Sequence, residues 1–180
     1  DCTGHGVSAA LNAMRCHTLI QEHADLLLQP ELFLTTLDDK LSRTLPPGSF
    51  ITVCGGLIDT RQRLLHTISA GGPGLLSITP KGVELIACAG QPLGLGRGGY
   101  TTEKYALQPG QTLLAYSDAL TEARHQNGKR WLTQGVIQAV KQYGLSAATL
   151  SSFMGHFLAT AEALEDDLTA LAITLPTATN

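Results

Sequence analysis

The middle of the chain constrains the fold more than any other feature. Six short runs rich in aliphatic and β-branched residues follow one another between residues 50 and 116, with turn residues between them. Strands spaced about ten residues apart, without helices between them, are typical of antiparallel sheets. Short turns predict hairpins for the first two strands and for the last two. The predicted strands cover residues 50–58, 64–69, 74–79, 83–88, 101–107 and 112–116.

Helical patterns flank this block on both sides. Ser8 is the expected N-cap of the first helix, and Pro30 opens the second. Helices followed by strands, then helices and a last strand, predict an α+β protein whose helices cover sheet faces. The predicted helices cover residues 8–28, 30–45, 132–143 and 147–164, and the last strand covers 168–175.

The first predicted helix has an apolar side. Its apolar positions recur at steps of three or four, which predicts one buried face. His17 lies on this face, so we expect it in the core. The face consists of Ala10, Met14, His17, Ile20, Ala24 and Leu27.

Composition excludes several classes of protein. With 43% hydrophobic and 15% charged residues, the chain is not expected to be disordered. A formal net charge of −3 and a pI near 6.0 argue against nucleic-acid or anionic-membrane binding through bulk charge. The four cysteines contain no Cys-x-x-Cys pair, so we expect free thiols in a reducing compartment, the cytoplasm. They are Cys2, Cys16, Cys54 and Cys88.

Four acidic residues stand next to predicted strands or turns. Asp1 precedes a glycine-rich turn, Asp118 follows the run 112–116, and Asp166 and Asp167 precede the last strand. Each of them alone is better explained as a turn or cap residue, so the argument depends on all of them together. Carboxylates that meet at one sheet edge repel each other unless a cation lies between them. Mg²⁺ and Mn²⁺ prefer such oxygen ligands, so convergence of these residues would predict a metal site.

Six stretches together resemble the PP2C-type metal-dependent serine/threonine phosphatases, in the bacterial branch that includes SpoIIE and RsbU. The first, Asp-Cys-Thr-Gly-His-Gly-Val-Ser-Ala-Ala at residues 1–10, is similar to the family's Asp-x-x-Gly-His-Gly-x-x-Ala-Ala. The matches follow the family's order over essentially the whole chain. The others are Ser-Ala-Gly-Gly-Pro at 69–73, Gly-Gln-Pro-Leu-Gly at 90–94, Leu-Gln-Pro-Gly-Gln at 107–111, Leu-Ala-Tyr-Ser-Asp-Ala-Leu-Thr-Glu-Ala at 114–123 and Asp-Asp-Leu-Thr at 166–169.

The resemblance implies a fold and a chemistry. The fold would be a four-layer α/β/β/α sandwich of two antiparallel sheets flanked by helices. Two Mn²⁺ or Mg²⁺ ions would activate a water that attacks a phosphoserine or phosphothreonine. The implied metal ligands are Asp1, the carbonyl of Cys2, Asp118 and Asp166, with Asp167 close by. His5 is either a hydrogen-bonding group near the phosphate or a turn histidine that satisfies neighbouring backbone.

The chain departs from the family pattern at three points. The family has a further metal-ligating aspartate on a strand before the first motif. We therefore expect residues 1–180 to be a single phosphatase domain, N-terminally truncated and cut from a larger signalling protein. Gly72 replaces a common histidine, and Ala119 replaces a glycine beside Asp118. An alanine disfavours positive φ angles, so the local geometry is expected to differ there.

Two other enzyme classes fit the sequence less well. Residues 94–99 match Gly-x-Gly-x-x-Gly, but a dinucleotide-binding motif should open a helix, and β-leaning residues follow. A hydrolase triad could use Ser8 or Ser117 with His5, but neither serine stands in Gly-x-Ser-x-Gly.

The stronger alternative is a degenerate phosphatase domain that binds a partner protein without catalysis. As an enzyme, the domain would act on a phosphorylated STAS-domain anti-sigma-factor antagonist, under the control of an upstream sensor or receiver domain. The resemblance implies these partners. No nucleic-acid partner is expected, and a homodimer is an open alternative.

Overall fold

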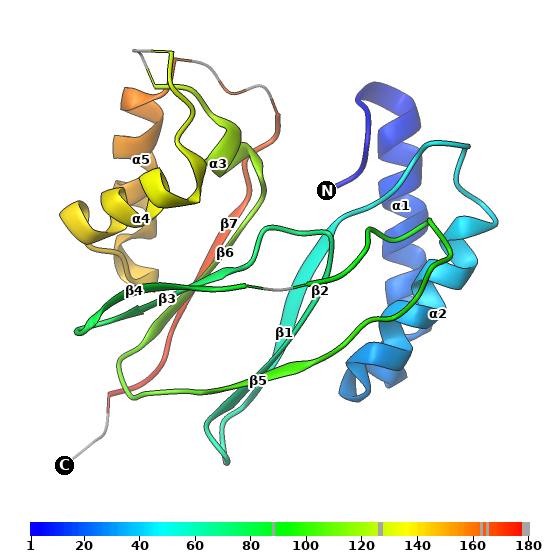
Figure 1. Ribbon diagram of the computed structural model, residues 1–180, viewed down its shortest axis with the longest axis horizontal. Coiled ribbons are helices and arrows are strands. Elements are labelled where there is room, and N and C mark those ends of the chain that lie inside the picture. The colour runs from blue at the N-terminus through cyan, green and yellow to red at the C-terminus, as the bar shows by residue number, and fades with distance from the viewer. Residues whose placement is uncertain (88, 126–127, 163, 165, 178–180) are drawn as a thin grey trace. The chain divides into compact units, whose positions relative to one another are not determined.

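The computed structural model describes residues 1–87, 89–125, 128–162, 164 and 166–177, and its contacts divide the chain into two compact units (Figure 1). Unit 1 comprises Asp1–Gly72 and Cys88–Ala106, and unit 2 comprises Pro73–Ala87 and Leu107–Asn180. The single domain over residues 1–180 stays a prediction. Within the described residues, no helix combines the length and apolar character needed to span a bilayer.

Unit 1 contains a three-stranded antiparallel sheet. Its strands are β1 (Val53–Asp59), β2 (Leu64–Ala70) and β5 (Glu103–Ala106), in the order β1-β2-β5. The predicted first hairpin is confirmed, because β1 pairs with β2 along its whole length.

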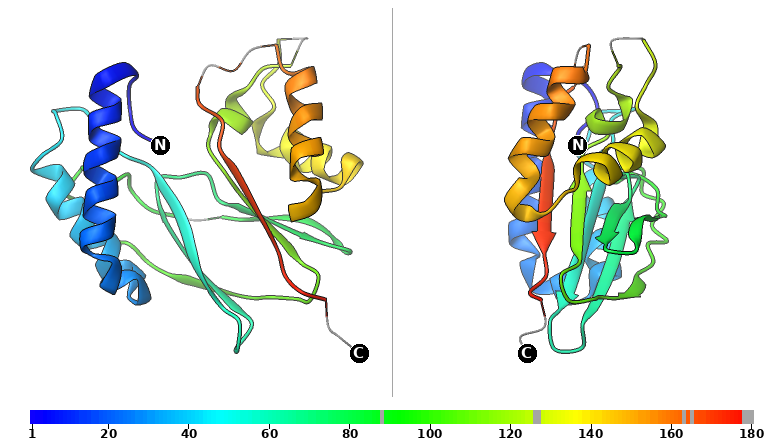
Figure 2. Two further views of the ribbon diagram at one scale, coloured as in Figure 1. Left: turned by 180° about the vertical axis from the view of Figure 1, so that it is seen from behind. Right: turned by 90° about the vertical axis from the view of Figure 1, so that its left-hand side faces the viewer.

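Helices α1 (Gly6–Glu22) and α2 (Pro30–Ser42) and the 3₁₀ helix η1 (Ala24–Leu28) complete unit 1. Both α-helices lie on the same side of the sheet (Figure 2). Helix α2 supplies most of the helical core, and its buried side chains meet buried residues of β2 and of the loop before β5. The buried core residues are Cys16, Phe33, Leu34, Leu37, Leu41, Ile51, Ile68, Ala70, Leu93 and Tyr100.

The predicted buried face of α1 is wrong. His17 is exposed, and 63% of Met14 is accessible to solvent. The buried positions are Asn12 and Cys16, with Ile20 half-buried beside them. Apolar residues occur on more than one side of this helix, so their spacing does not decide which side packs. The helix also ends at Glu22 rather than at residue 28, and it begins at Gly6 with His5 rather than Ser8 at the N-cap position.

Unit 2 contains a four-stranded antiparallel sheet. Its strands are β3 (Leu75–Thr79), β4 (Gly82–Ile86), β6 (Thr112–Tyr116) and β7 (Ala170–Thr174), in the order β4-β3-β6-β7. The strand predicted over residues 83–88 ends at Ile86, and Cys88 lies outside the described residues.

The predicted hairpin between residues 101–107 and 112–116 is wrong. Strand β5 pairs with β2 in unit 1, whereas β6 pairs with β3 and β7 in unit 2. The turn between them does not set their pairing, because the chain passes from one unit to the other there. Gln111 instead fixes the start of β6, since its side chain donates to Ser77 Oγ of β3 at 2.9 Å.

The helices of unit 2 are α3 (Ala119–Glu122), α4 (Leu132–Tyr143), the 3₁₀ helix η2 (Ala147–Thr149) and α5 (Leu150–Thr160). The prediction for residues 132–143 is confirmed. The helix predicted over residues 147–164 is present as η2 and α5, and α5 ends at Thr160.

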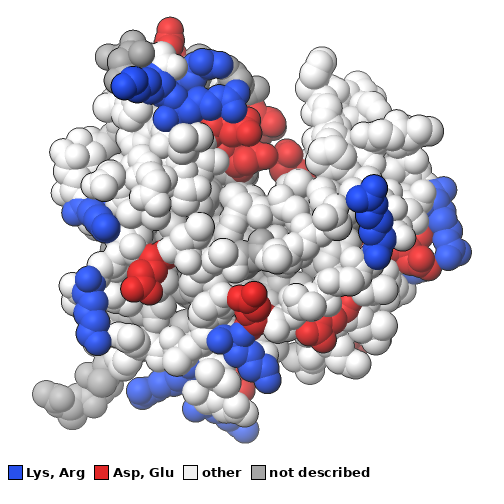
Figure 3. Space-filling view, viewed as in Figure 1, with Lys and Arg blue, Asp and Glu red and all other residues white. Residues whose placement is uncertain are grey.

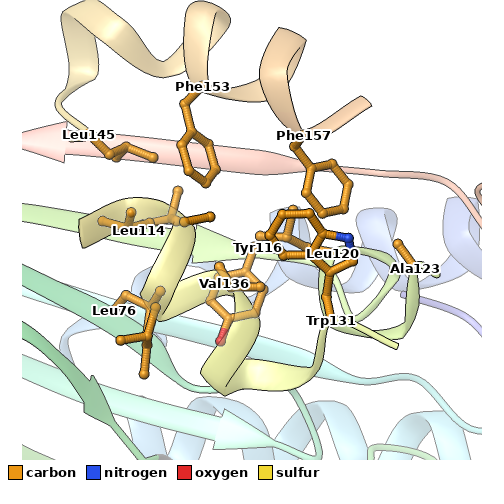
Figure 4. Packing of buried hydrophobic residues seen from close by; sticks show 13 residues of the cluster. Leu76, Leu114, Tyr116, Leu120, Ala123, Trp131, Val136, Leu145, Phe153 and Phe157 are labelled. Carbon is orange, nitrogen blue, oxygen red and sulfur yellow. The ribbon is translucent and has the colours of Figure 1, made fainter. Parts of the chain in front are cut away.

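The rings of Trp131, at the N-cap position of α4, and of Phe153 and Phe157 in α5 pack over the sheet of unit 2 (Figure 4). Leu114 of β6 is fully buried opposite Leu76 of β3. Trp131 stacks on His125 with ring centroids 4.0 Å apart, and its centroid is 4.9 Å from that of Phe157. The predicted α+β class, with two antiparallel sheets flanked by helices, is confirmed.

Candidate metal centre

Asp118 stands where β6 ends and α3 begins. It occupies the N-cap position of α3 and is half-buried, but its side chain makes no capping hydrogen bond. Its backbone carbonyl accepts the amide of Thr121 at 2.8 Å and the Thr121 hydroxyl at 2.9 Å. The backbone of Asp118 is therefore fixed while its carboxylate takes no part in holding the helix.

Asp166 brings a second carboxylate to the same place in unit 2. One of its carboxylate oxygens and one of Asp118 lie within 4.8 Å of each other. Asp166 is exposed, and its Oδ1 accepts the amide of the following residue, Asp167, at 2.7 Å. Figure 3 shows acidic side chains gathered in this part of the surface beside a group of Lys and Arg side chains. Two carboxylates at this separation repel each other unless a cation or a proton neutralises them.

Ser117 ties the two acidic segments together. Its backbone amide donates to the Thr169 carbonyl at 2.9 Å, and its hydroxyl donates to the Asp167 carbonyl at 3.1 Å. The same hydroxyl accepts the Thr169 amide at 3.0 Å. Three hydrogen bonds thus hold the loop that carries Asp166 against the end of β6. Sequence reasoning missed this role of Ser117, although its place directly before Asp118 was a signal.

Asp1 and Cys2 lie in unit 1, where they pair with residues 50–52, the segment directly before β1. The Asp1 carbonyl accepts the Thr52 amide at 2.9 Å, and the Thr3 amide donates to Phe50 at 3.1 Å. This pairing places Cys2 opposite Ile51, and the backbone hydrogen bonds between the two segments do not use the Cys2 carbonyl. The Asp1 side chain is exposed. Burial raises the pKa of the Cys2 thiol, and the N-terminal charge partly opposes this shift.

His5 is exposed and extended, directly before α1. Its side chain makes no capping bond to the helix. Gly4 and Gly6 on either side have φ angles of +92° and +75°, which most other residues would adopt only with strain. The two glycines therefore allow the sharp turn that the sequence predicts between Asp1 and the helix.

The two substitutions relative to the family pattern, Ala119 and Gly72, have different structural settings. Ala119 lies in the first turn of α3 and is not among the residues with positive φ angles, so alanine causes no strain there. At Gly72, a Cβ atom would lie 2.9 Å from the Val53 carbonyl oxygen and 3.0 Å from the Cys54 Cβ. This backbone conformation accommodates glycine but not histidine.

The structure also decides between the competing enzyme classes. The glycine-rich loop 94–99 leads to strand β5 and opens no helix, so the dinucleotide-binding interpretation fails. The Ser117 hydroxyl donates to the Asp167 carbonyl, as described above, rather than to a histidine. Ser8 lies inside α1 and is exposed. Neither serine has the setting of an activated nucleophile.

The donor chemistry of the acidic pair fits a hard divalent cation. Both groups offer carboxylate oxygens, which suit Mg²⁺ and Mn²⁺ better than metals that prefer sulfur or nitrogen. The ion pair between Arg43 and Asp39 lies at the C-terminal end of α2 and involves neither Asp118 nor Asp166.

Comparison with solved structures identifies the fold as that of PP2C-type phosphatase domains. The RsbU and RsbW domains of Rv1364c from Mycobacterium tuberculosis match with a TM-score of 0.79 and 22% identity, over 100% of this chain and 52% of that one. The SiaA PP2C domain of Pseudomonas aeruginosa matches with a TM-score of 0.78 and 21% identity, over 96% and 71% of the two chains. The catalytic domain of the serine/threonine phosphatase PstP, in complex with two manganese ions, matches with a TM-score of 0.71 and 12% identity, over 97% and 85%.

The sequence profile of the family described as Stage II sporulation protein E (SpoIIE) matches residues 1–176. The chain therefore belongs to the SpoIIE family, which confirms the predicted resemblance. It spans about half the length of the Mycobacterium tuberculosis protein. None of the curated protein sequences matches it.

Proposed function

We propose that this domain hydrolyses phosphoserine or phosphothreonine in a signalling protein, with Mn²⁺ or Mg²⁺ as cofactor. The observation that carries the proposal is the pair Asp118 and Asp166, whose carboxylate oxygens lie within 4.8 Å of each other. In this proposal Asp1 and the Cys2 carbonyl join them as ligands, and Asp167 lies close by. PstP, which has the same fold, was solved with two manganese ions, and this supports a two-ion site here.

The residues of this chain would hold and orient the reacting groups. When bound, the ions supply positive charge for the phosphate and lower the pKa of a water that attacks phosphorus. Asp118 and Asp166 hold that charge in place, because the Ser117 hydrogen bonds fix the segments that carry them. His5 has an exposed side chain that makes no bond to α1, so we propose that it offers a hydrogen bond to the phosphate.

The proposed substrate is a phosphorylated STAS-domain anti-sigma-factor antagonist in the cytoplasm, with an upstream sensor or receiver domain as regulator. One solved protein with this fold carries RsbU and RsbW domains in the same chain, which supports a role in such a signalling pathway. Turnover of phosphorylated STAS-domain protein, compared with an unrelated phosphoprotein, tests this part of the proposal.

A second candidate function is partner binding without catalysis. The observation that favours it is Gly72, where the close Val53 and Cys54 backbone leaves no space for the family's histidine. Such an adaptor would bind its partner with equal affinity with and without Mn²⁺.

Phosphate release from p-nitrophenyl phosphate and from a phosphoprotein, with and without Mn²⁺, tests the enzyme. We expect metal-dependent turnover by the full-length protein and its loss in Asp118→Asn. Glu84→Gln is the matched control, because Glu84 is an exposed acid on β4 of the same unit. If the full-length protein has no turnover but keeps partner binding, the adaptor function replaces the enzyme.

A further inference from the structure

A buried carboxylate in α2 holds the glycine-rich loop of unit 1. Asp38 is only 2% exposed. Its Oδ1 accepts the amides of Gly94 at 2.8 Å and Gly96 at 3.0 Å, and its Oδ2 accepts the amide of Gly98 at 3.0 Å. Among the described residues, no Lys or Arg forms an ion pair with Asp38. The backbone of the loop therefore solvates this charge.

The alternating glycines of the loop are explained by this carboxylate. Gly94, Gly96 and Gly98 have φ angles of +95°, +63° and +56°, which turn every second amide toward Asp38. At Gly94, a Cβ atom would lie 2.5 Å from Leu45 Cδ1. The motif that resembles a phosphate-binding loop in sequence thus binds an internal anion.

The loop is connected by backbone pairing to the first proposed metal ligand. Leu93, the residue before the loop, exchanges two hydrogen bonds with Ile51, of 2.8 and 2.9 Å. Ile51 in turn lies opposite Cys2, and the Thr52 amide donates to the Asp1 carbonyl at 2.9 Å. Two successive antiparallel bridges therefore lead from the loop that Asp38 holds to the backbone of Asp1.

We propose that Asp38 is a positioning residue for the metal site, which acts through the loop 94–98 and Ile51 on Asp1. This inference rests on the proposed function. In Asp38→Asn the negative charge is lost and an NH2 group replaces Oδ2, so the Gly98 amide loses its acceptor, while Oδ1 can still accept the Gly94 and Gly96 amides. The loop is then held less firmly, and Leu93 and Ile51 are less firmly placed. The consequence is weaker metal binding, because a ligand that is not held in position must be ordered by the metal.

The test compares Asp38→Asn with Asp39→Asn in the full-length protein. Both substitutions make the same chemical change at adjacent positions of α2, but Asp39 is an exposed residue paired with Arg43. Mn²⁺ affinity is measured by calorimetry, together with the Mn²⁺ concentration for half-maximal phosphatase activity and kcat at saturating Mn²⁺. We expect about tenfold weaker Mn²⁺ binding for Asp38→Asn, with kcat largely restored at saturation. Asp39→Asn should match the wild type.

A purely structural role would give a different result. Irreversible loss of folded protein lowers the apparent kcat and the calorimetric number of Mn²⁺ sites, and it leaves the half-saturating Mn²⁺ concentration unchanged. Leu34→Ala, a core change in the same helix, serves as the destabilised control. If Asp38→Asn fails to fold, Gly98→Ala perturbs the same contact from the loop, where a Cβ meets no atom within 4 Å. It should weaken Mn²⁺ binding in the same direction.

The outcomes separate the two proposals. If wild-type protein binds no Mn²⁺, the proposed function fails, and this inference fails with it. If wild-type protein binds Mn²⁺ and the Asp38 and Gly98 variants bind it equally well, only this inference is overturned. The inference about Asp38 is also overturned if Leu34→Ala weakens Mn²⁺ binding as much as Asp38→Asn does. Faster amide exchange at Ile51 and Thr52 in Asp38→Asn, without such a change in Asp39→Asn, would support the proposed connection.

Discussion

Replacing Asp118 by asparagine distinguishes a metal ligand from a helix cap. The Asp118 side chain makes no capping bond to α3, and one of its oxygens lies within 4.8 Å of an Asp166 oxygen. Two unit charges 4.8 Å apart, the longest separation that this limit allows, repel by about 0.9 kcal/mol in water, and salt weakens the repulsion. We therefore expect metal-free Asp118→Asn to be as stable as the wild type, or more stable by an amount of this order.

Addition of Mn²⁺ should reverse this order. A ligand that binds only the folded state stabilises it by about 2.7 kcal/mol at a free concentration 100 times its Kd. The wild type gains this stabilisation, and Asp118→Asn gains much less because it has lost one anionic ligand. The difference between the two proteins should thus change sign when the metal is added.

Urea unfolding of both proteins after EDTA treatment, and again with Mn²⁺, measures this effect. Glu84→Gln removes one exposed acid from the same unit and should follow the wild type in both conditions. A metal-free loss of more than about 1 kcal/mol in Asp118→Asn would instead indicate a lost cap. Equal stabilisation of Asp118→Asn and the wild type by Mn²⁺ would equally refute the assignment.

Two further predictions concern unit 1. Gly90→Ala should destabilise the protein by about 3 kcal/mol or more, because its Cβ would lie 1.9 Å from the Ser69 carbonyl oxygen, a backbone atom that a rotamer change cannot move. Gly55→Ala in β1, where a Cβ meets nothing within 4 Å, should have a small effect in the same urea titration. Burial and then the charge of Asp38 raise the pKa of Tyr100 above its usual 10.0. The stabilisation from its bound proton is therefore complete below pH 10 and is lost as the pH rises further, by at most about 1.4 kcal/mol per pH unit. Metal-free wild-type protein should lose stability above pH 10 more steeply than Tyr100→Phe, and parallel curves would contradict this.

The sequence predicts the secondary structure and the acidic pair well. The regular spacing of short apolar runs identifies the strands, because a strand must bury one side and end in a turn. Asp118 and Asp166 each stand beside a strand, and the pairing of β6 with β7 brings those ends to one edge of the sheet. The family motifs extend this prediction to Asp1 and Cys2, whose role as metal ligands stays a prediction.

Other features depend on contacts that the sequence does not specify. The buried side of α1 could not be chosen by periodicity, because Val7, Leu11 and Met14 are apolar and yet 79%, 61% and 63% exposed. The partners of β5 and β6 depend on which sheet each strand joins, not on the turn between them. The role of Asp38 was equally hidden, because its three partners are backbone amides of residues far along the chain.

The interleaved path of the chain has a consequence for its synthesis. Strands β3 and β4 leave the ribosome before β5 has completed unit 1, but their sheet needs β6 and β7, which are made later. The hairpin of β3 and β4 is therefore made before the strands that pair with it, and the second segment of unit 1 is made in between. A premature stop codon between residues 117 and 169 would leave β6 without β7, so the truncated product would expose an open strand edge prone to aggregation.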